Sequence, residues 1–389
     1  MENFVFSNPT KIIFGRGTEM QVGKEAAVYS QKILLLYGSG SIKTTGLYDR
    51  VVKSLKDKNI EFVELPGVKA NPVLSLVYKG IRICREQNIE FILAVGGGSV
   101  IDTAKAIAAG VLYDGDVWDF FSDKAVVKQA LPVGTVLTIP AAGSEASTGS
   151  VITKEDGMLK RAFNSIHVYP RFSILNPELA ITLPPYQAAC GAVDIMAHLM
   201  ERYFTNVQNV ELTDRLIEAA MKTMITNAPI VIQQPTNYDA WAELMWTGTV
   251  AHNNLLNTGR IGDWGSHEIE HEISAMYDMA HGAGLAIVFP AWMKYVYKHD
   301  LSRFVQFAVR VWNVEPDYFN PGWTALQGIE RLESFWQLLG LPTQLSAAGI
   351  DDKHFIEMAA KCTNSGQKTV SNFVKLNQAD VVSIYKLAY

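Results

Sequence analysis

The sequence predicts two domains, an α/β domain at the N-terminus and an all-α domain at the C-terminus. The chain has 389 residues, which is long enough for two hydrophobic cores. Strand-like and helix-like segments alternate up to about residue 180, and strand signals almost vanish after that point. We therefore expect one domain over residues 1–180 and a second over residues 181–389.

The first domain is expected to contain a parallel sheet. Residues 32–37, 90–95 and 134–140 are short apolar runs, and residues 47–58 and 74–88 between them have helical periodicity. Continuous apolar runs are typical of strands buried on both faces, and strand–helix–strand order at this spacing indicates parallel βαβ units. The expected fold is therefore Rossmann-like, with helices on both faces of the sheet.

The second domain is expected to be helical throughout. Proline-containing stretches at 175–177 and 183–185 mark the change of character. Beyond them, amphipathic helical patterns are clearest over residues 213–227, 240–254 and 324–339.

Composition narrows the class of protein. The net charge is −5 and the basic residues are scattered, so we expect no nucleic-acid partner. The three cysteines, Cys84, Cys190 and Cys362, are odd in number and far apart, which indicates neither a disulfide framework nor a Cys-x-x-Cys zinc site. This usage is typical of the reducing cytoplasm.

One segment has about the length of a membrane span. Residues 91–113 are largely apolar, but they include Asp102, Lys105 and a glycine triplet. A bilayer would penalise these residues heavily, so we expect a buried strand followed by a helix and no membrane partner.

A glycine-rich loop is the first candidate for phosphate binding. The segment Gly96-Gly97-Gly98-Ser99 follows an expected strand and opens an expected helix. Glycines allow a phosphate to approach the backbone, and the helix N-terminus favours an anion. The G-x-G-x-x-G pattern is incomplete because position 101 is isoleucine. On the loop alone, nucleotide binding and a simple tight turn both remain open.

A second loop, at residues 37–43, bears on the choice of nicotinamide cofactor. It carries Gly38, Ser39, Ser41 and Lys43, and no acidic residue lies between positions 32 and 49. A carboxylate at the adenosine ribose favours NAD and repels a 2′-phosphate. The small hydroxyls and the lysine therefore favour NADP(H) over NAD(H), although a solvated polar loop would have the same composition.

Histidines and one aspartate form a candidate metal constellation. Asp194 and His198 are four residues apart, as are His267 and His271, and His281 follows soon after. On a helix this spacing places both members of a pair on one face. Neutral imidazole and carboxylate are usual ligands of divalent first-row metals.

Two of these histidines, His267 and His271, also match a zinc-peptidase signature. The segment 267–271 fits H-E-x-x-H, which would make His267 and His271 zinc ligands and Glu268 the general base. The longer H-x-x-G-x-x-H extension is absent, and a peptidase would leave both glycine loops unexplained.

Taken together, the motifs resemble the iron-dependent (group III) alcohol dehydrogenase family, and within it the butanol dehydrogenase branch. The resemblance runs nearly end to end. It rests on Phe14-Gly15-Arg16-Gly17, Gly96-Gly97-Gly98-Ser99 with Asp102, Gly143-Ser144-Glu145, Asn176-Pro177-Glu178-Leu179, Asp194-x-x-x-His198, and His267 with His271 and His281-Gly282.

The resemblance implies a dinucleotide-binding domain, a helical metal-binding domain and roles for individual residues. The implied ligands of Fe²⁺, with Zn²⁺ as the other metal considered, are Asp194, His198, His267 and His281. His271 would face the substrate and act catalytically instead of binding the metal. The implied cofactor-binding residues are Gly38, Ser39, Ser41, Asn71, Gly97, Gly98, Ser99, Asp102, Thr138, Ser144, Lys160 and Leu179.

The implied activity is hydride transfer between NADP(H) or NAD(H) and a primary alcohol or aldehyde such as butanol or butanal. Three neutral histidines and one aspartate would leave a bound divalent metal with net positive charge, which suits an incoming oxygen anion. The chain departs from many relatives in having glycine instead of aspartate at position 38. The alternatives are a lyase similar to dehydroquinate synthase, with transient NAD reduction, and the metallopeptidase. A homodimer is expected.

Overall fold

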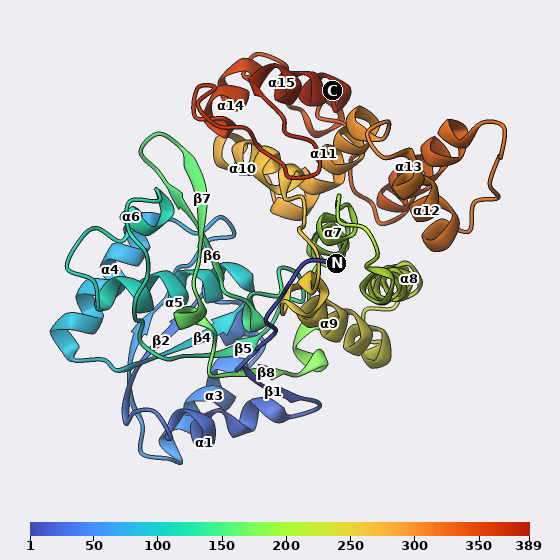
Figure 1. The fold of residues 1–389 in the computed structure, drawn as a ribbon. Coiled ribbons are helices and arrows are strands. Elements are labelled where there is room, and N and C mark those ends of the chain that lie inside the picture. Colours follow the sequence, from blue (N-terminus) through green and yellow to red (C-terminus); the bar gives the residue numbers. More distant parts are fainter. The chain divides into compact units, whose positions relative to one another are not determined.

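The computed structural model describes residues 1–389 and divides into two compact units. The first, which we call the sheet unit, comprises residues 7–183 and 235–253. The second, the helical unit, comprises residues 1–6, 184–234 and 254–389. The predicted classes are confirmed, because the parallel sheet lies wholly in the first unit and long helices dominate the second (Figure 1).

The sheet unit is built around six parallel strands in the order β1-β8-β5-β4-β2-β3. Their bounds are β1 (Lys11–Phe14), β2 (Lys32–Tyr37), β3 (Glu61–Leu65), β4 (Phe91–Gly96), β5 (Val133–Leu137) and β8 (Phe172–Leu175). The helices of this unit are α1 (Val22–Ala26), α2 (Ser41–Thr44), α3 (Leu47–Lys56), α4 (Leu74–Gln87), α5 (Gly98–Val111), α6 (Trp118–Phe121) and α9 (Tyr238–His252).

The central strands form because their side chains are buried on both faces. Strands β4 and β5 have no exposed or half-exposed residue, which explains the unbroken apolar runs in the sequence. On one face, α1 and α3 pack against alternate residues of β2 and β4 in a single hydrophobic cluster. Helices α4 and α5 pack together on the other face (Figure 1).

The strand order reverses between β2 and β4, and this reversal places the two glycine loops. From β2 the chain continues through α3 to the edge strand β3, and from β4 it continues through α5 to β5 on the other side. Tyr37 and Val95 are register partners, so Gly38, just after β2, and Gly96, the last residue of β4, lie at the same end of the sheet. In open α/β sheets, ligands bind at the carboxyl ends of strands where the order reverses.

Strands β1, β3 and β8 were not among the predicted strands, and two further features depart from the expected alternation of parallel strands and helices. Strands β6 (Gly149–Lys154) and β7 (Leu159–Asn164) form an antiparallel hairpin. Helix α9 belongs to this unit although it lies far beyond the expected boundary near residue 180. It is held there by contacts such as the hydrogen bond from Thr249 Oγ1 to Glu145 Oε1 at 2.6 Å.

The helical unit has eight α-helices. They are α7 (Pro185–Tyr203), α8 (Glu211–Gln233), α10 (Gly265–Tyr277), α11 (His281–Val296), α12 (Leu301–Trp312), α13 (Pro321–Leu338), α14 (Phe355–Cys362) and α15 (Gln378–Leu387). Helix α7 packs against α8 and α11, and α10 packs against α11 and α14. No helix in either unit combines the length and apolar character that crossing a membrane requires.

Candidate metal and cofactor sites

Three helices of the helical unit bring the candidate metal ligands together. Asp194 and His198 lie one turn apart on the buried part of α7. His267 lies in the first turn of α10, and His281 is the first residue of α11. Both of these histidines lie at the N-terminal ends of their helices, so their positions depend on where α10 and α11 begin.

The imidazoles converge on one carboxylate oxygen. The Nε2 atom of His198 lies 3.3 Å from Asp194 Oδ1, and the Nε2 atoms of His267 and His281 each lie 3.8 Å from it. The ring centroids of His198 and His267 are 4.7 Å apart, and those of His267 and His281 are 5.3 Å apart. Asp194, His267 and His281 form one set of closely spaced donor atoms, and His198 adjoins this set through its Nε2 contact with Asp194.

The chemistry of this donor set fits a divalent cation. Asp194 Oδ1 and His267 Nε2 are buried and have no hydrogen-bond partner. A buried polar atom left in this way costs about 1–3 kcal/mol, a cost that a bound cation would remove. Burial by itself would raise the pKa of Asp194, but His198, His267 and His281 outweigh it and hold that pKa well below its usual range. The carboxylate is therefore ionised, as a ligand must be.

His271 lies next to the cluster in a different group. Its ring centroid is 5.5 Å from that of His281, and His271, Glu270 and His281 form a second set of closely spaced donor atoms. The set that contains Asp194 includes His267 and His281 but neither His198 nor His271. His198 differs from His271 in that its Nε2 lies 3.3 Å from Asp194 Oδ1. The two histidines of the H-E-x-x-H segment thus have different surroundings, which does not support a zinc-peptidase arrangement.

Two fully buried glutamates that the sequence analysis missed support the histidines. Glu201 of α7 lies with Oε1 2.8 Å from His267 Nδ1. Glu270 of α10 forms a hydrogen bond with His281 Nδ1 through Oε2. The available signal was weak: each glutamate lies three residues after a candidate histidine ligand, on the same face of its helix.

Glu201 also fixes the start of α10. Its carboxylate accepts hydrogen bonds from the backbone N–H groups of Trp264 at 2.5 Å and His267 at 3.1 Å. These are among the donors at a helix N-terminus that lack an intrahelical acceptor. Trp264 itself has a φ of 70°, a left-handed conformation that is rare for a bulky residue. Strain of this kind occurs mainly at functional sites, where the surrounding structure over-determines it.

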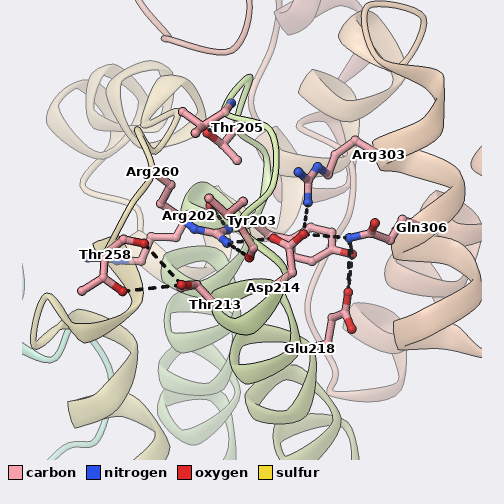
Figure 2. Close-up of polar contacts among 12 residues, drawn as sticks. Arg202, Tyr203, Thr205, Thr213, Asp214, Glu218, Thr258, Arg260, Arg303 and Gln306 are labelled. Atoms are coloured by element: carbon pink, nitrogen blue, oxygen red, sulfur yellow. Dashed lines mark hydrogen bonds and ion pairs between the residues drawn. The ribbon is translucent and has the colours of Figure 1, made fainter. Parts of the chain in front are cut away.

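A buried polar network anchors the helix that carries Asp194 and His198 (Figure 2). Asp214 of α8 lies between two guanidinium groups, 2.8 Å from Arg260 Nη2 and 2.6 Å from Arg303 Nη1. Arg260 Nη1 also donates to the carbonyl oxygen of Arg202 at the end of α7, at 2.9 Å. Tyr203, the last residue of α7, donates its hydroxyl to Glu218 at 2.9 Å. The network therefore fixes α7 against α8 and α12.

In the sheet unit, Gly97, Gly98 and Thr138 lie at the carboxyl ends of β4 and β5. Gly97 precedes α5 and Gly98 begins it, and a Cβ at either position would lie 3.1 Å from Ile139 or Ala142. Neither loop position has room for a larger side chain without displacing these neighbours. Thr138, just after β5, donates its backbone N–H to the carbonyl oxygen of Gly96 at 3.1 Å. The glycine loop is thus close-packed and positioned at the helix N-terminus, where phosphate binding is favourable.

Ser144 forms hydrogen bonds with both Asp102 and a buried lysine, Lys105. Ser144 Oγ donates to Asp102 Oδ1 at 2.5 Å, and Lys105 Nζ donates to the carbonyl oxygens of Ser144 at 2.7 Å and Ser147 at 2.9 Å. Lys105 is fully buried, and burial lowers its pKa to about 8, while Asp102 and Glu145 oppose that shift. Lys105 was not predicted as a site residue, and its role is to hold the Ser144 loop against α5.

Four further predicted cofactor residues, Asn71, Ser99, Lys160 and Leu179, have contacts within the sheet unit. Lys160 of β7 donates to Asn71 Oδ1 at 3.1 Å, and both residues are buried. Ser99 at the start of α5 donates its hydroxyl to the carbonyl oxygen of Ala70. Leu179 packs against the sheet cluster on the α1 and α3 face.

The loop after β2 has an acidic neighbour that the sequence analysis did not anticipate. Glu64 of β3 accepts hydrogen bonds at 2.5 Å from the hydroxyls of Tyr37 and Tyr48. Its Oε2 lies 3.6 Å from Lys43 Nζ, and that ammonium also lies over the Tyr48 ring at 4.6 Å. Lys43 is therefore paired with a carboxylate from the neighbouring strand.

Comparison with known families agrees with this arrangement. Residues 9–177 match the family described as iron-containing alcohol dehydrogenase, and residues 188–389 match the C-terminal part of the Fe-containing alcohol dehydrogenase family. The chain belongs to the iron-containing alcohol dehydrogenase family. It is therefore an oxidoreductase of the alcohol dehydrogenase and aldehyde reductase type, as the motifs predict, and neither matched family is a dehydroquinate synthase or a peptidase.

Individual members of the iron-containing alcohol dehydrogenase family are similar over nearly the whole chain. A probable NADH-dependent butanol dehydrogenase 1 of Bacillus subtilis is 46% identical over 99% of both chains. The NADPH-dependent aldehyde reductase YqhD of Escherichia coli is 37% identical over 94% of both. A crystal structure of NADH-dependent butanol dehydrogenase A from Thermotoga maritima has a TM-score of 0.96 and 42% identity, covering 100% of this chain and 99% of that one.

Proposed function

We propose that this enzyme interconverts a short primary alcohol and its aldehyde, with butanol and butanal as the representative pair. In the reductive direction, NAD(P)H, a proton and the aldehyde give NAD(P)⁺ and the alcohol. The observation that carries the proposal is the convergence of three imidazole Nε2 atoms on Asp194 Oδ1 in a member of this family. The printed names of the relatives support the choice of substrate class.

Asp194, His198, His267 and His281 would hold the metal. Iron is proposed because of the family, although nitrogen and oxygen ligands also suit zinc, which the general affinity order favours over Fe²⁺. When bound, the metal supplies Lewis acidity that polarises the carbonyl oxygen or lowers the pKa of the alcohol.

His271 is the proposed proton carrier. It lies beside His281 without belonging to the donor group around Asp194, so its imidazole can exchange a proton with the substrate oxygen. In the sheet unit, the loops at Gly38 and Gly97 would bind the dinucleotide phosphates and ribose. Asp102, Ser144 and Lys160 would also bind the cofactor, and Asn71 would lie near its adenosine end. Hydrogen bonds between Ser144 and Asp102 and between Lys160 and Asn71 hold these side chains in place.

We propose that the enzyme accepts NADH as well as NADPH. The sequence favours NADP(H), because small side chains and Lys43 follow β2 without an acidic residue. The Lys43–Glu64 pair reduces the positive charge available to a 2′-phosphate, which weakens that preference. A relative named as NADH-dependent is 46% identical, and one named as NADPH-dependent is 37% identical.

We also propose a cellular location and an oligomeric state for the enzyme. The three cysteines are free thiols, two of them buried, which supports the reducing cytoplasm as the location. A homodimer is proposed because the edge strand β1 has one side without a partner strand and carries Phe14, which is 40% exposed.

The proposal is tested by measuring oxidation of NADH and of NADPH with C2–C6 aldehydes, using protein loaded with Fe²⁺ or Zn²⁺. We expect turnover that requires metal and occurs with both nicotinamides. Failure of the metal-loaded protein to oxidise either nicotinamide across the whole series would contradict the assignment.

A further inference from the structure

Two buried glutamates make directed hydrogen bonds to histidines of the candidate metal site. Glu201 and Glu270 are fully buried, and each makes a hydrogen bond to the Nδ1 atom of a different histidine, His267 or His281. Ser274 Oγ donates to the other oxygen of Glu270 and so fixes the orientation of that carboxylate. Buried carboxylates are uncommon unless they are paired, and these two are paired with candidate ligands.

These hydrogen bonds select one tautomer of each imidazole. A histidine must be neutral to bind a metal, and one that bonds through Nδ1 to a carboxylate oxygen then carries its single proton on Nδ1. The lone pair is then on Nε2, and the Nε2 atoms of His267 and His281 are the ones that lie 3.8 Å from Asp194 Oδ1. Each glutamate therefore turns the coordinating nitrogen of its histidine toward the centre of the cluster.

The glutamates also change the charge of the site. Asp194 and three neutral histidines would leave a bound divalent cation with one net positive charge. Glu201 and Glu270 are each one hydrogen bond away from a proposed ligand, and in their ionised forms they would reverse that sign. Arg202, which is fully buried and donates Nη1 to the carbonyl oxygen of His198 at 2.7 Å, returns one positive charge. The protein around the donor atoms is therefore suited to retaining a divalent cation.

We propose that Glu201 and Glu270 are positioning residues that set the affinity and ligand geometry of the metal site through His267 and His281. This inference rests on the proposed ligand set. Carboxylates bonded to metal-binding histidines raise the basicity of the ligand, and their loss typically lowers metal affinity about 10–100-fold. Glu270 is the better residue to test, because Glu201 also caps α10 and its replacement would affect folding.

The test measures the affinity of the protein for Co²⁺ by competition with a chelator, together with the visible spectrum of the Co²⁺ protein. Glu270→Gln keeps the side-chain shape and an acceptor oxygen but removes the charge. We expect it to lower Co²⁺ affinity about 10–100-fold and to shift the visible bands. Glu268→Gln is the matched control, since Glu268 lies on the same helix, is 40% exposed and faces Lys368 at 3.6 Å. It should leave both measurements unchanged.

Two further variants keep the outcome interpretable. Ser274→Ala removes only the hydroxyl that orients Glu270, and we expect a smaller loss of affinity in the same direction, even if Glu270→Gln folds poorly. His281→Ala tests the ligand set itself. If His281→Ala loses Co²⁺ while Glu270→Gln and Ser274→Ala bind it with unchanged affinity and spectrum, the inference is wrong and the ligand set stands. If His281→Ala retains Co²⁺ affinity, the proposed ligand set is wrong.

Discussion

Replacing Asp194 with asparagine is expected to remove most of the bound metal and to lower kcat/KM for butanal reduction at least about 1000-fold. Asp194 is the single carboxylate among the proposed ligands, and its Oδ1 lies within 3.8 Å of all three imidazole nitrogens. Lewis-acid activation contributes several kcal/mol to the transition state, and each 1.36 kcal/mol is a factor of ten in rate. Asparagine has nearly the same shape, so the loss would come from charge.

The measurement is metal content and steady-state kinetics on the same preparation. Asp114→Asn, at an exposed position in the sheet unit, is the control and should change neither. An Asp194→Asn protein that kept a full equivalent of metal and more than a tenth of the activity would contradict the proposed role of the carboxylate.

Replacing Asp214 with alanine is expected to destabilise the helical unit by about 3–5 kcal/mol, because it leaves two buried arginines without their shared partner. Arg260 has no exposed side-chain surface, and Arg303 has only 8% exposed. Figure 2 shows both guanidinium groups converging on the Asp214 carboxylate. For a unit of this size, the corresponding fall in Tm is at least about 6 °C.

The matched control for this prediction is Glu211→Gln, one turn earlier on α8. Glu211 pairs with Arg215 at 3.1 Å, but both side chains are more than half exposed. An exposed pair contributes less than about 1 kcal/mol, so the control should move the Tm little. Calorimetric scans of the two metal-free variants would decide the point, and similar Tm values would contradict a structural role for the buried network.

The predicted fold was accurate where the sequence signal came from burial. The strand expected at 32–37 coincides with β2, because a strand covered on both faces has no polar alternation. The hairpin of β6 and β7 was missed for the opposite reason: β7 carries polar residues such as Lys160 and Arg161 and lacks an apolar run. Helix α9 was predicted as a helix, but periodicity does not say which unit a helix packs against.

The candidate metal site, too, could be predicted only in part. The pairs Asp194/His198 and His267/His271 were recognised because i,i+4 spacing places two side chains on one face of a helix. Glu201 and Glu270 were missed because a glutamate three residues after a histidine is usually solvent-exposed, and only tertiary packing buries these two. Glu64 was missed because it reaches the loop after β2 from the neighbouring strand, 27 positions beyond Tyr37 in the sequence.

The central claim is that His271 and His281 have different roles: His281 binds the metal, and His271 exchanges a proton with the substrate. The most direct test is the metal content of His281→Ala and His271→Ala, purified and dialysed in parallel with the unaltered enzyme. The account predicts that His281→Ala loses the metal, while His271→Ala keeps a full equivalent and is slow in aldehyde reduction. Loss of the metal from His271→Ala with retention in His281→Ala would contradict it.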